Sequence, residues 1–251
     1  MKSLASIILF LATFVAVVSA HGALLFPTPR GGYRTKGYNG RVHAFLGYRD
    51  KVHSLTYPCG GFPPVPPTPM RAGQRIDVRF AVPKMPDRDF NKQPKKPSSG
   101  KQMEQARHGG GFCEFSLSYD NGKTFYTIAR YSRTCPDAYY LWPVRIPPRA
   151  PSCTRKGQCL FVWTWTAHIL DQFYMNCADI TLRGSSKPNL KRVPIQMFDF
   201  RSKLLKKQPQ LRITAADGDG GKTKAGPGPN PNEIRMNLKN QLPPLPKFKK
   251  H

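Results

Sequence analysis

Residues 112–133 place the strongest constraint on the fold of this chain. Phe115, Leu117 and Tyr119 alternate there with polar residues, so these three side chains are expected on one face of an extended strand. The triplet Asp120-Asn121-Gly122 follows, and a second run rich in aromatic and β-branched residues occupies positions 124–128. An Asn-Gly pair between two such runs is the strongest short-range signal of a β-hairpin. The segment therefore predicts two antiparallel strands.

Three other segments have the composition of strands. Residues 74–82 alternate between apolar and polar side chains, which predicts a half-buried strand. Residues 160–165 and 175–182 are rich in Trp and β-branched residues. Because Trp163 and Trp165 are two positions apart on such a strand, we expect both in the core.

The rest of the first 186 residues gives no convincing amphipathic helix. Residues 21–58 are rich in Gly, Arg and Tyr and predict a long loop region with short strands, and residues 83–107 predict a long exposed loop. Short antiparallel strands joined by long loops indicate an all-β fold. We expect an immunoglobulin- or fibronectin-III-like β-sandwich, with a single closed barrel as the alternative.

Residues 1–20 have the pattern of a secretory signal peptide. Lys2 is followed by an almost unbroken apolar run at 7–18, and small residues precede the expected cleavage point after Ala20. The pattern predicts a secreted protein, extracellular or associated with a cell wall, whose first mature residue is His21. No other stretch is apolar over the roughly 18 residues that a membrane span requires.

Six cysteines remain after the predicted cleavage. An even number in a secreted chain predicts three disulfides, but six cysteines allow 15 pairings. No two of them have the Cys-x2-Cys spacing of many zinc sites, so structural zinc is not favoured. The six are Cys59, Cys113, Cys135, Cys153, Cys159 and Cys177.

The chain is strongly basic, with a formal net charge of +26. Residues 187–251 hold 15 Lys and Arg against 4 Asp and Glu, which gives +11, and they are rich in Pro and Gly. Such a segment buries little apolar surface and is expected to be largely disordered. We therefore predict a signal peptide at 1–20, a β-sandwich domain at 21–186 and a basic tail at 187–251. The charge favours anionic wall polymers as partners of the tail, and a secreted, disulfide-rich chain makes nucleic acid an unexpected partner.

A free N-terminal histidine can bind a metal through both its α-amine and its imidazole. If His21 begins the mature chain, further ligands come from the remaining histidines. Among these, His108 precedes three glycines at the mouth of the predicted hairpin, where other backbone can approach closely. Neutral nitrogen donors of this kind suit Cu(II) better than Zn(II) or Ca(II). The other candidates are His43, His53, His168 and His251.

Gln172 and Tyr174 are two residues apart and would share one face of a strand. They are either ordinary buried hydrogen-bonding groups or an axial metal ligand, Tyr174, with Gln172 supporting it.

These segments together resemble the lytic polysaccharide monooxygenases, most closely their fungal chitin-active branch. The resemblance spans roughly residues 21–184. Each matching piece is short, but their joint order, with histidine at the predicted mature N-terminus, is specific. The matching pieces are His21-Gly22, Pro58-Cys59-Gly60-Gly61, residues 108–113 and 115–120, Trp163-Thr164-Trp165, and Tyr174-Met175-Asn176-Cys177-Ala178.

The resemblance implies a copper histidine brace with one ion per chain. His21 would supply its α-amine and imidazole, His108 a second imidazole and Tyr174 the axial phenol. Gln172 would position the oxygen species, although chitin-active fungal relatives usually have Glu there. The resemblance further implies disulfides Cys59–Cys177, Cys113–Cys135 and Cys153–Cys159.

The function implied by the resemblance is oxidative cleavage of an insoluble polysaccharide, with chitin favoured, by a monomeric enzyme. The co-substrates would be a reductant and hydrogen peroxide or dioxygen. One alternative is a copper-binding wall or surface protein that uses the brace without cleaving glycans. A second is a polysaccharide-binding structural protein without metal. Tyrosines that could stack on sugar rings are Tyr33, Tyr38, Tyr48 and Tyr57.

Overall fold

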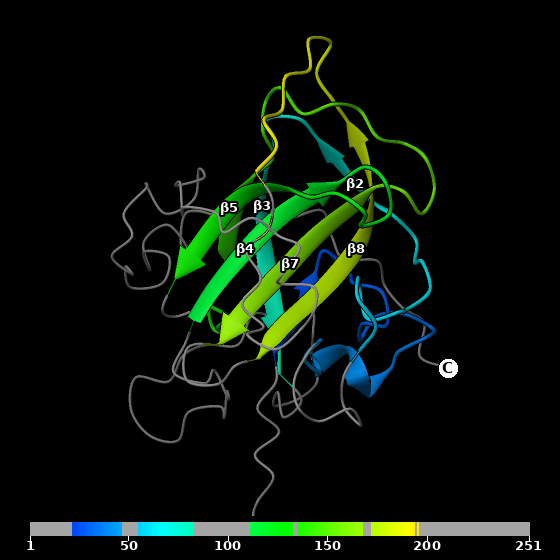
Figure 1. The fold of residues 1–251 in the computed structure, drawn as a ribbon, viewed down its shortest axis with the longest axis vertical. Coiled ribbons are helices and arrows are strands. Elements are labelled where there is room, and N and C mark those ends of the chain that lie inside the picture. Colours follow the sequence, from blue (N-terminus) through cyan, green and yellow to red (C-terminus); the bar gives the residue numbers. More distant parts are fainter. Residues whose placement is uncertain are drawn as a thin grey trace, which may run out of the picture.

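The computed structural model describes residues 22–46, 55–82, 111–132, 135–167, 172–193 and 195. His21, His108, the predicted signal peptide, the loop at 83–107 and residues 196–251 lie outside these ranges. The described elements are β1 (Ala23–Phe26), the 3-10 helix η1 (Gly40–His43), β2 (Thr68–Arg71), β3 (Arg75–Ala81), β4 (Gly111–Ser118), β5 (Tyr126–Ser132), β6 (Trp142–Arg145), β7 (Leu160–Ala167) and β8 (Phe173–Arg183) (Figure 1).

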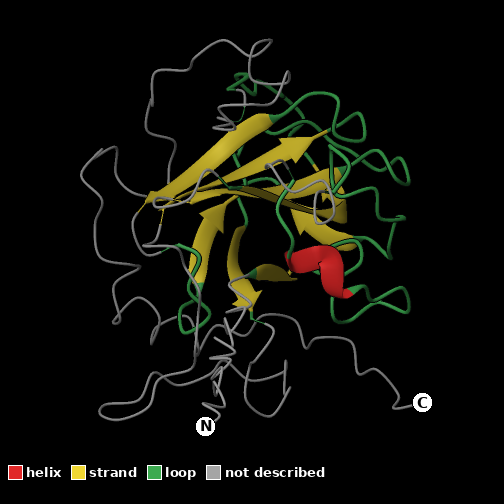
Figure 2. Cartoon of the chain, turned by 60° about the horizontal axis from the view of Figure 1, so that its bottom comes forward, coloured by secondary structure: helices red, strands yellow, loops and turns green. Residues whose placement is uncertain are grey.

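The strands form two sheets. The smaller has the order β1-β3-β6 and the larger the order β2-β8-β7-β4-β5. All pairings are antiparallel except β2 with β8. Figure 2 shows the strands in two layers, with η1 beside them. One buried cluster contains apolar side chains of both sheets, so the predicted β-sandwich is confirmed and the single closed barrel is not observed.

The predicted hairpin is formed by β4 and β5. Asn121 and Gly122 both have positive φ, 57° and 83°, the conformation for which Asn and Gly are the favoured residues. Asp120 holds the turn by accepting hydrogen bonds from the backbone N–H groups of Lys123 and Thr124 and from the Thr124 hydroxyl. The reversal extends over residues 119–125, longer than a two-residue turn.

The core contains Trp163 and Trp165, both 0% exposed, as their spacing predicts. β3 differs from expectation, because Asp77 and Arg79 on its supposedly exposed face are also buried. β3 is the middle strand of the smaller sheet, and the Asp77 carboxylate accepts a hydrogen bond from Arg75 Nε at 3.3 Å. This ion pair provides a partner for the buried Asp77 carboxylate.

Two short strands, β2 and β6, were not predicted because each contains a proline, Pro69 and Pro143. Each is an edge strand of its sheet. Proline removes a backbone donor and is tolerated in sheets mainly at such edges.

Three disulfides link the described residues: Cys59–Cys177, Cys113–Cys135 and Cys153–Cys159. They are the three pairs that the family resemblance implies. Cys59–Cys177 attaches the loop after residue 55 to β8, and Cys113–Cys135 attaches the segment before β6 to β4.

Residues 184–193 and Ile195 pack on the sandwich. The Ser185 N–H donates to the Ala150 carbonyl, and the Thr127 N–H on β5 donates to the Val193 carbonyl. Ile195 is 1% exposed in a second apolar cluster. In the part of the chain described here, no helix is long and apolar enough to cross a membrane.

Candidate metal centre

Gln172 and Tyr174 form a buried hydrogen-bonded pair at the start of β8. Gln172 is 9% exposed and Tyr174 1%. The Tyr174 hydroxyl donates to Gln172 Oε1, so the two side chains lie on the same face, as their spacing predicts.

The Tyr174 ring is fixed by aromatic neighbours. It stacks on Trp165 of β7 with ring centroids 4.5 Å apart and planes 25° apart. Phe45 contacts it edge to face at 6.1 Å. Burial raises the pKa of Tyr174 above that of an ordinary tyrosine, so the side chain is a neutral phenol in the metal-free protein.

Asn176, two residues beyond Tyr174, connects β8 to the N-terminal segment. Its Oδ1 accepts a hydrogen bond of 2.8 Å from the Leu24 N–H on β1, and its Nδ2 donates to the Val42 carbonyl of η1 at 2.9 Å. The sequence interpretation did not single out Asn176, although a third polar residue at every second position (172, 174, 176) was the available signal.

The described residues that follow His21 and His108 in sequence lie at this same end of the sandwich. A Cβ added at Gly22 would stand 3.3 Å from Pro136 Cγ, and the adjacent Cys135 is bonded to Cys113 of β4. Gly111, where β4 begins, pairs with Ala167, whose N–H donates to the Gln172 carbonyl at 3.0 Å. Figure 1 shows β4 and β8 beginning at one end of the larger sheet.

Two of the residues expected at a copper site, Gln172 and Tyr174, lie within the described ranges, and their chemistry is compatible with copper. Gln172 and Tyr174 add a neutral amide and a neutral phenol and no negative charge, which suits a centre held mainly by neutral nitrogen donors. No group of three His, Cys, Asp or Glu side chains suited to a metal occurs among the described residues. A metal centre here would therefore need ligands from outside the described residues, where the expected ligands His21 and His108 lie, as do His53, His168 and His251.

The remaining candidates from the sequence have different environments. His43 is buried in η1 and meets Tyr33 edge to face at 4.9 Å. Tyr38 is 48% exposed and stacks on Tyr33 at 4.9 Å with planes 20° apart. Tyr57 is half-buried, which raises its pKa to about 12, and Tyr48 lies outside the described residues.

Comparison with known proteins gives one curated relative by sequence. No family model matches the chain. The chain is 43% identical over 83 residues to an AA11 family lytic polysaccharide monooxygenase A from Aspergillus fumigatus (strain CBS 144.89 / FGSC A1163 / CEA10). The match covers 32% of this chain and 35% of the relative, so the chain spans about a third of that protein's length.

A structural comparison finds a lytic polysaccharide monooxygenase from Kitasatospora papulosa. It has a TM-score of 0.29 and 16% identity, and the match covers 62% of this chain and 65% of that one. The sequence match, rather than this weak structural one, confirms the predicted resemblance of the chain to the lytic polysaccharide monooxygenases.

Proposed function

We propose that this protein is a secreted, copper-dependent lytic polysaccharide monooxygenase acting on chitin or a related cell-wall polysaccharide. The observation that carries the proposal is the buried Tyr174–Gln172 pair, at the end of the sandwich where the described neighbours of His21 and His108 also lie. The 43% identity to an AA11 family enzyme supports it.

In this proposal, His21 and His108 hold one copper ion. Removal of the signal peptide after Ala20 would free the His21 α-amine, which then binds together with its imidazole. Bound copper would supply the one-electron chemistry by which a reductant and hydrogen peroxide or dioxygen oxidise a C–H bond of the glycosidic linkage.

The hydrogen bond of Tyr174 would leave its phenol oxygen available as a further ligand to the copper ion. A phenol has one proton, and Tyr174 donates it to Gln172 Oε1. The phenol oxygen therefore has only lone pairs to offer in any other direction. Gln172 orients the phenol, and its amide NH2 provides donors for an oxygen-containing reactant. Trp165 and Phe45 restrict rotation of the Tyr174 ring.

We further propose that Tyr38 contacts the polysaccharide. It is the one large hydrophobic side chain among the described residues that is exposed. It stacks on Tyr33, which packs against His43 of η1. η1 is attached to β8 through the Val42 carbonyl, and Leu46 N–H donates to the Phe173 carbonyl. Tyr38 thus belongs to the surface beside the proposed metal centre, where a flat sugar face can stack on its ring.

The proposal is tested by electron paramagnetic resonance on the mature protein with one equivalent of Cu(II). We expect an axial spectrum with nitrogen hyperfine structure that is lost in His108→Ala. His251→Ala, which removes an imidazole from the tail, is the matched control and should leave the spectrum unchanged. A spectrum of loosely held aqueous copper in the unmodified protein would contradict the proposed centre.

Activity is tested separately by product analysis on chitin, cellulose and other β-glucans with a reductant and hydrogen peroxide. Oxidised oligosaccharides from chitin that disappear in His108→Ala support the enzyme. Tight copper binding without oxidised products from any of these polymers would contradict cleavage and leave a copper-binding surface protein.

The position of His21 has its own test. Mass spectrometry of the secreted protein should give His21 as the first residue. A variant with one glycine added before His21 should lose the high-affinity copper signal, because the chelating α-amine is then part of a peptide bond.

A further inference from the structure

A cavity of about 400 Å³ lies at the end of the sandwich opposite Gln172 and Tyr174. Tyr119 follows the last residue of β4, and Tyr126 begins β5. β4 runs antiparallel to β7 and β7 antiparallel to β8, so β4 and β8 run in the same direction, and this end of β4 is far along the strand from Gly111 and Ala167. The volume is in the range of small-molecule binding sites.

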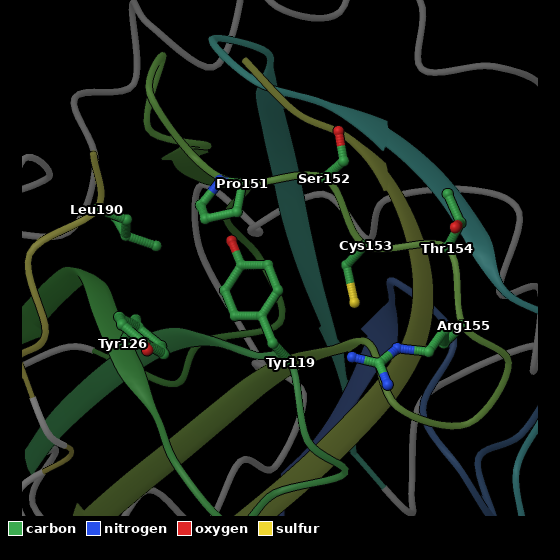
Figure 3. Close-up of a pocket in the computed structure, with 8 residues that line it drawn as sticks. All are labelled: Tyr119, Tyr126, Pro151, Ser152, Cys153, Thr154, Arg155 and Leu190. Atoms are coloured by element: carbon green, nitrogen blue, oxygen red, sulfur yellow. The ribbon is translucent and has the colours of Figure 1, made fainter. Parts of the chain in front are cut away.

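Two tyrosines provide the aromatic wall of the cavity. The rings of Tyr119 and Tyr126 meet edge to face, with centroids 5.5 Å apart and planes 87° apart. Figure 3 shows the Tyr119 hydroxyl directed between Pro151 and Leu190, which supply apolar surface. Tyrosine rings combine an apolar face with a polar tip, as a pyranose ring combines apolar C–H faces with hydroxyl groups.

Two polar groups of the cavity have hydrogen-bonding capacity that no described residue fills. The Tyr119 hydroxyl oxygen is buried, and within the described ranges no residue forms a hydrogen bond with it. Ser152 Oγ accepts a hydrogen bond from the Gly184 N–H at 2.9 Å, so its own proton remains available for donation. A bound molecule with hydroxyl or anionic oxygens would accept the proton of the exposed Ser152 hydroxyl.

The charge of this region favours an anion. Arg155 lines the cavity and is exposed, and no ion pair joins it to another described residue. Between residues 138 and 193, the described chain has eight Lys and Arg but one acid, Asp179. Asp179 is buried and already bound to Arg30 at 2.7 Å. Arg binds planar carboxylates and phosphates in a bidentate manner.

We propose that this cavity binds a pyranose unit bearing a carboxylate or a phosphate. The sugar ring packs against Tyr119 and Tyr126, the anionic group pairs with the Arg155 guanidinium, and Ser152 donates to a sugar oxygen. The site is separate from the proposed metal centre and does not require copper, so it would attach the protein to an acidic glycan independently of catalysis.

The test is calorimetric binding to the full mature protein at about 0.15 M salt, where distant surface charges are largely screened. The probes are a galacturonic acid trimer, mannose 6-phosphate and, as the neutral control, an N-acetylglucosamine trimer. We expect Arg155→Gln to weaken binding of the anionic probe about tenfold or more. Lys156→Gln removes the neighbouring exposed charge, which does not line the cavity, and should change binding less than about twofold.

The outcomes separate the possible sources of the ligand. Binding of the uronate trimer alone assigns a carboxylated glycan, and binding of mannose 6-phosphate alone assigns a phosphorylated one. Tyr126→Leu should weaken whichever binds, because the stacking ring is lost. Equal losses in the Arg155 and Lys156 variants would overturn the proposal in favour of general electrostatic attraction. Absence of binding, or equally tight binding of the neutral trimer, would also overturn it.

Discussion

The Tyr174 hydroxyl of β8 donates a hydrogen bond to the side chain of Gln172, which immediately precedes the strand. Tyr174→Phe keeps the ring stack on Trp165 and removes this donor. Because Gln172 Oε1 would then be buried without it, we expect the free energy of unfolding to fall by about 1–3 kcal/mol, measured by denaturant titration.

The same substitution tests the proposed metal centre. The Cu(II) spectrum of Tyr174→Phe should keep its nitrogen hyperfine structure but shift, since the phenol oxygen would be gone while the nitrogen donors remain. Tyr57→Phe, in a half-buried tyrosine packed against Phe125, should leave the spectrum unchanged. An unaltered spectrum in Tyr174→Phe would exclude Tyr174 as a copper ligand.

Two ion pairs of different burial should differ in their contribution to stability. Arg30 and Asp179 are 6% and 3% exposed, and Arg30 Nε and Nη2 both donate to the carboxylate, at 2.8 and 2.7 Å. Arg30→Gln leaves a buried carboxylate without its counter-charge and should cost about 3–5 kcal/mol. Arg75→Gln breaks a pair whose Arg is 42% exposed and should cost less than about 1 kcal/mol. Chemical denaturation of both variants gives the comparison, and similar losses would contradict this account.

The hairpin turn should contribute a pH-dependent stability. Burial alone would raise the pKa of Asp120, but hydrogen bonds from Thr124, Ser118 and Lys123 outweigh it and lower the pKa below that of the unfolded chain. A lowered pKa gives stability that is present above the unfolded value, near 4, and is lost as the pH falls through the folded value. The advantage of the unmodified protein over Asp120→Asn should therefore be full at pH 7 and shrink below about pH 4. An advantage that is constant from pH 7 to pH 2 would contradict this.

The basic tail should retain the protein on anionic wall material. Ile195 is buried, so the appropriate truncation removes residues 196–251 and spares the segment that packs on the sandwich. We expect the truncated protein to be retained less at low salt, and equally at high salt, where the attraction is screened. Retention on isolated wall material across a salt gradient is the measurement, and equal retention at low salt would reject the tether.

The sequence predicts correctly those features that depend on the alternation or spacing of residues over a few positions. Alternating apolar residues and the Asn121-Gly122 pair predict the hairpin. A separation of two residues along a strand predicts that Trp163 and Trp165 are both buried. The same separation predicts that Gln172 and Tyr174 share one face. Each depends on residues within a few positions of one another. The assignment of His21 and His108 as ligands remains a prediction.

Long-range contacts could not be predicted in this way. Asn176 bonds to the Leu24 N–H 152 positions away, and Arg30 meets Asp179 149 positions away. Asp77 was expected on an exposed face because alternation does not show whether another part of the chain covers that face. The prolines in β2 and β6 argue against strands in the sequence, because only the sheet order shows that both are edge strands, where proline is tolerated.

The same edge strands have a consequence for behaviour at high protein concentration. An open strand edge is a template for pairing with another copy of the chain. Here Pro69 and Pro143 interrupt the donor rows of β2 and β6, and Val193 accepts the Thr127 N–H of β5. At high local concentration, copies of the chain are therefore hindered from pairing edge to edge at β2, β5 and β6.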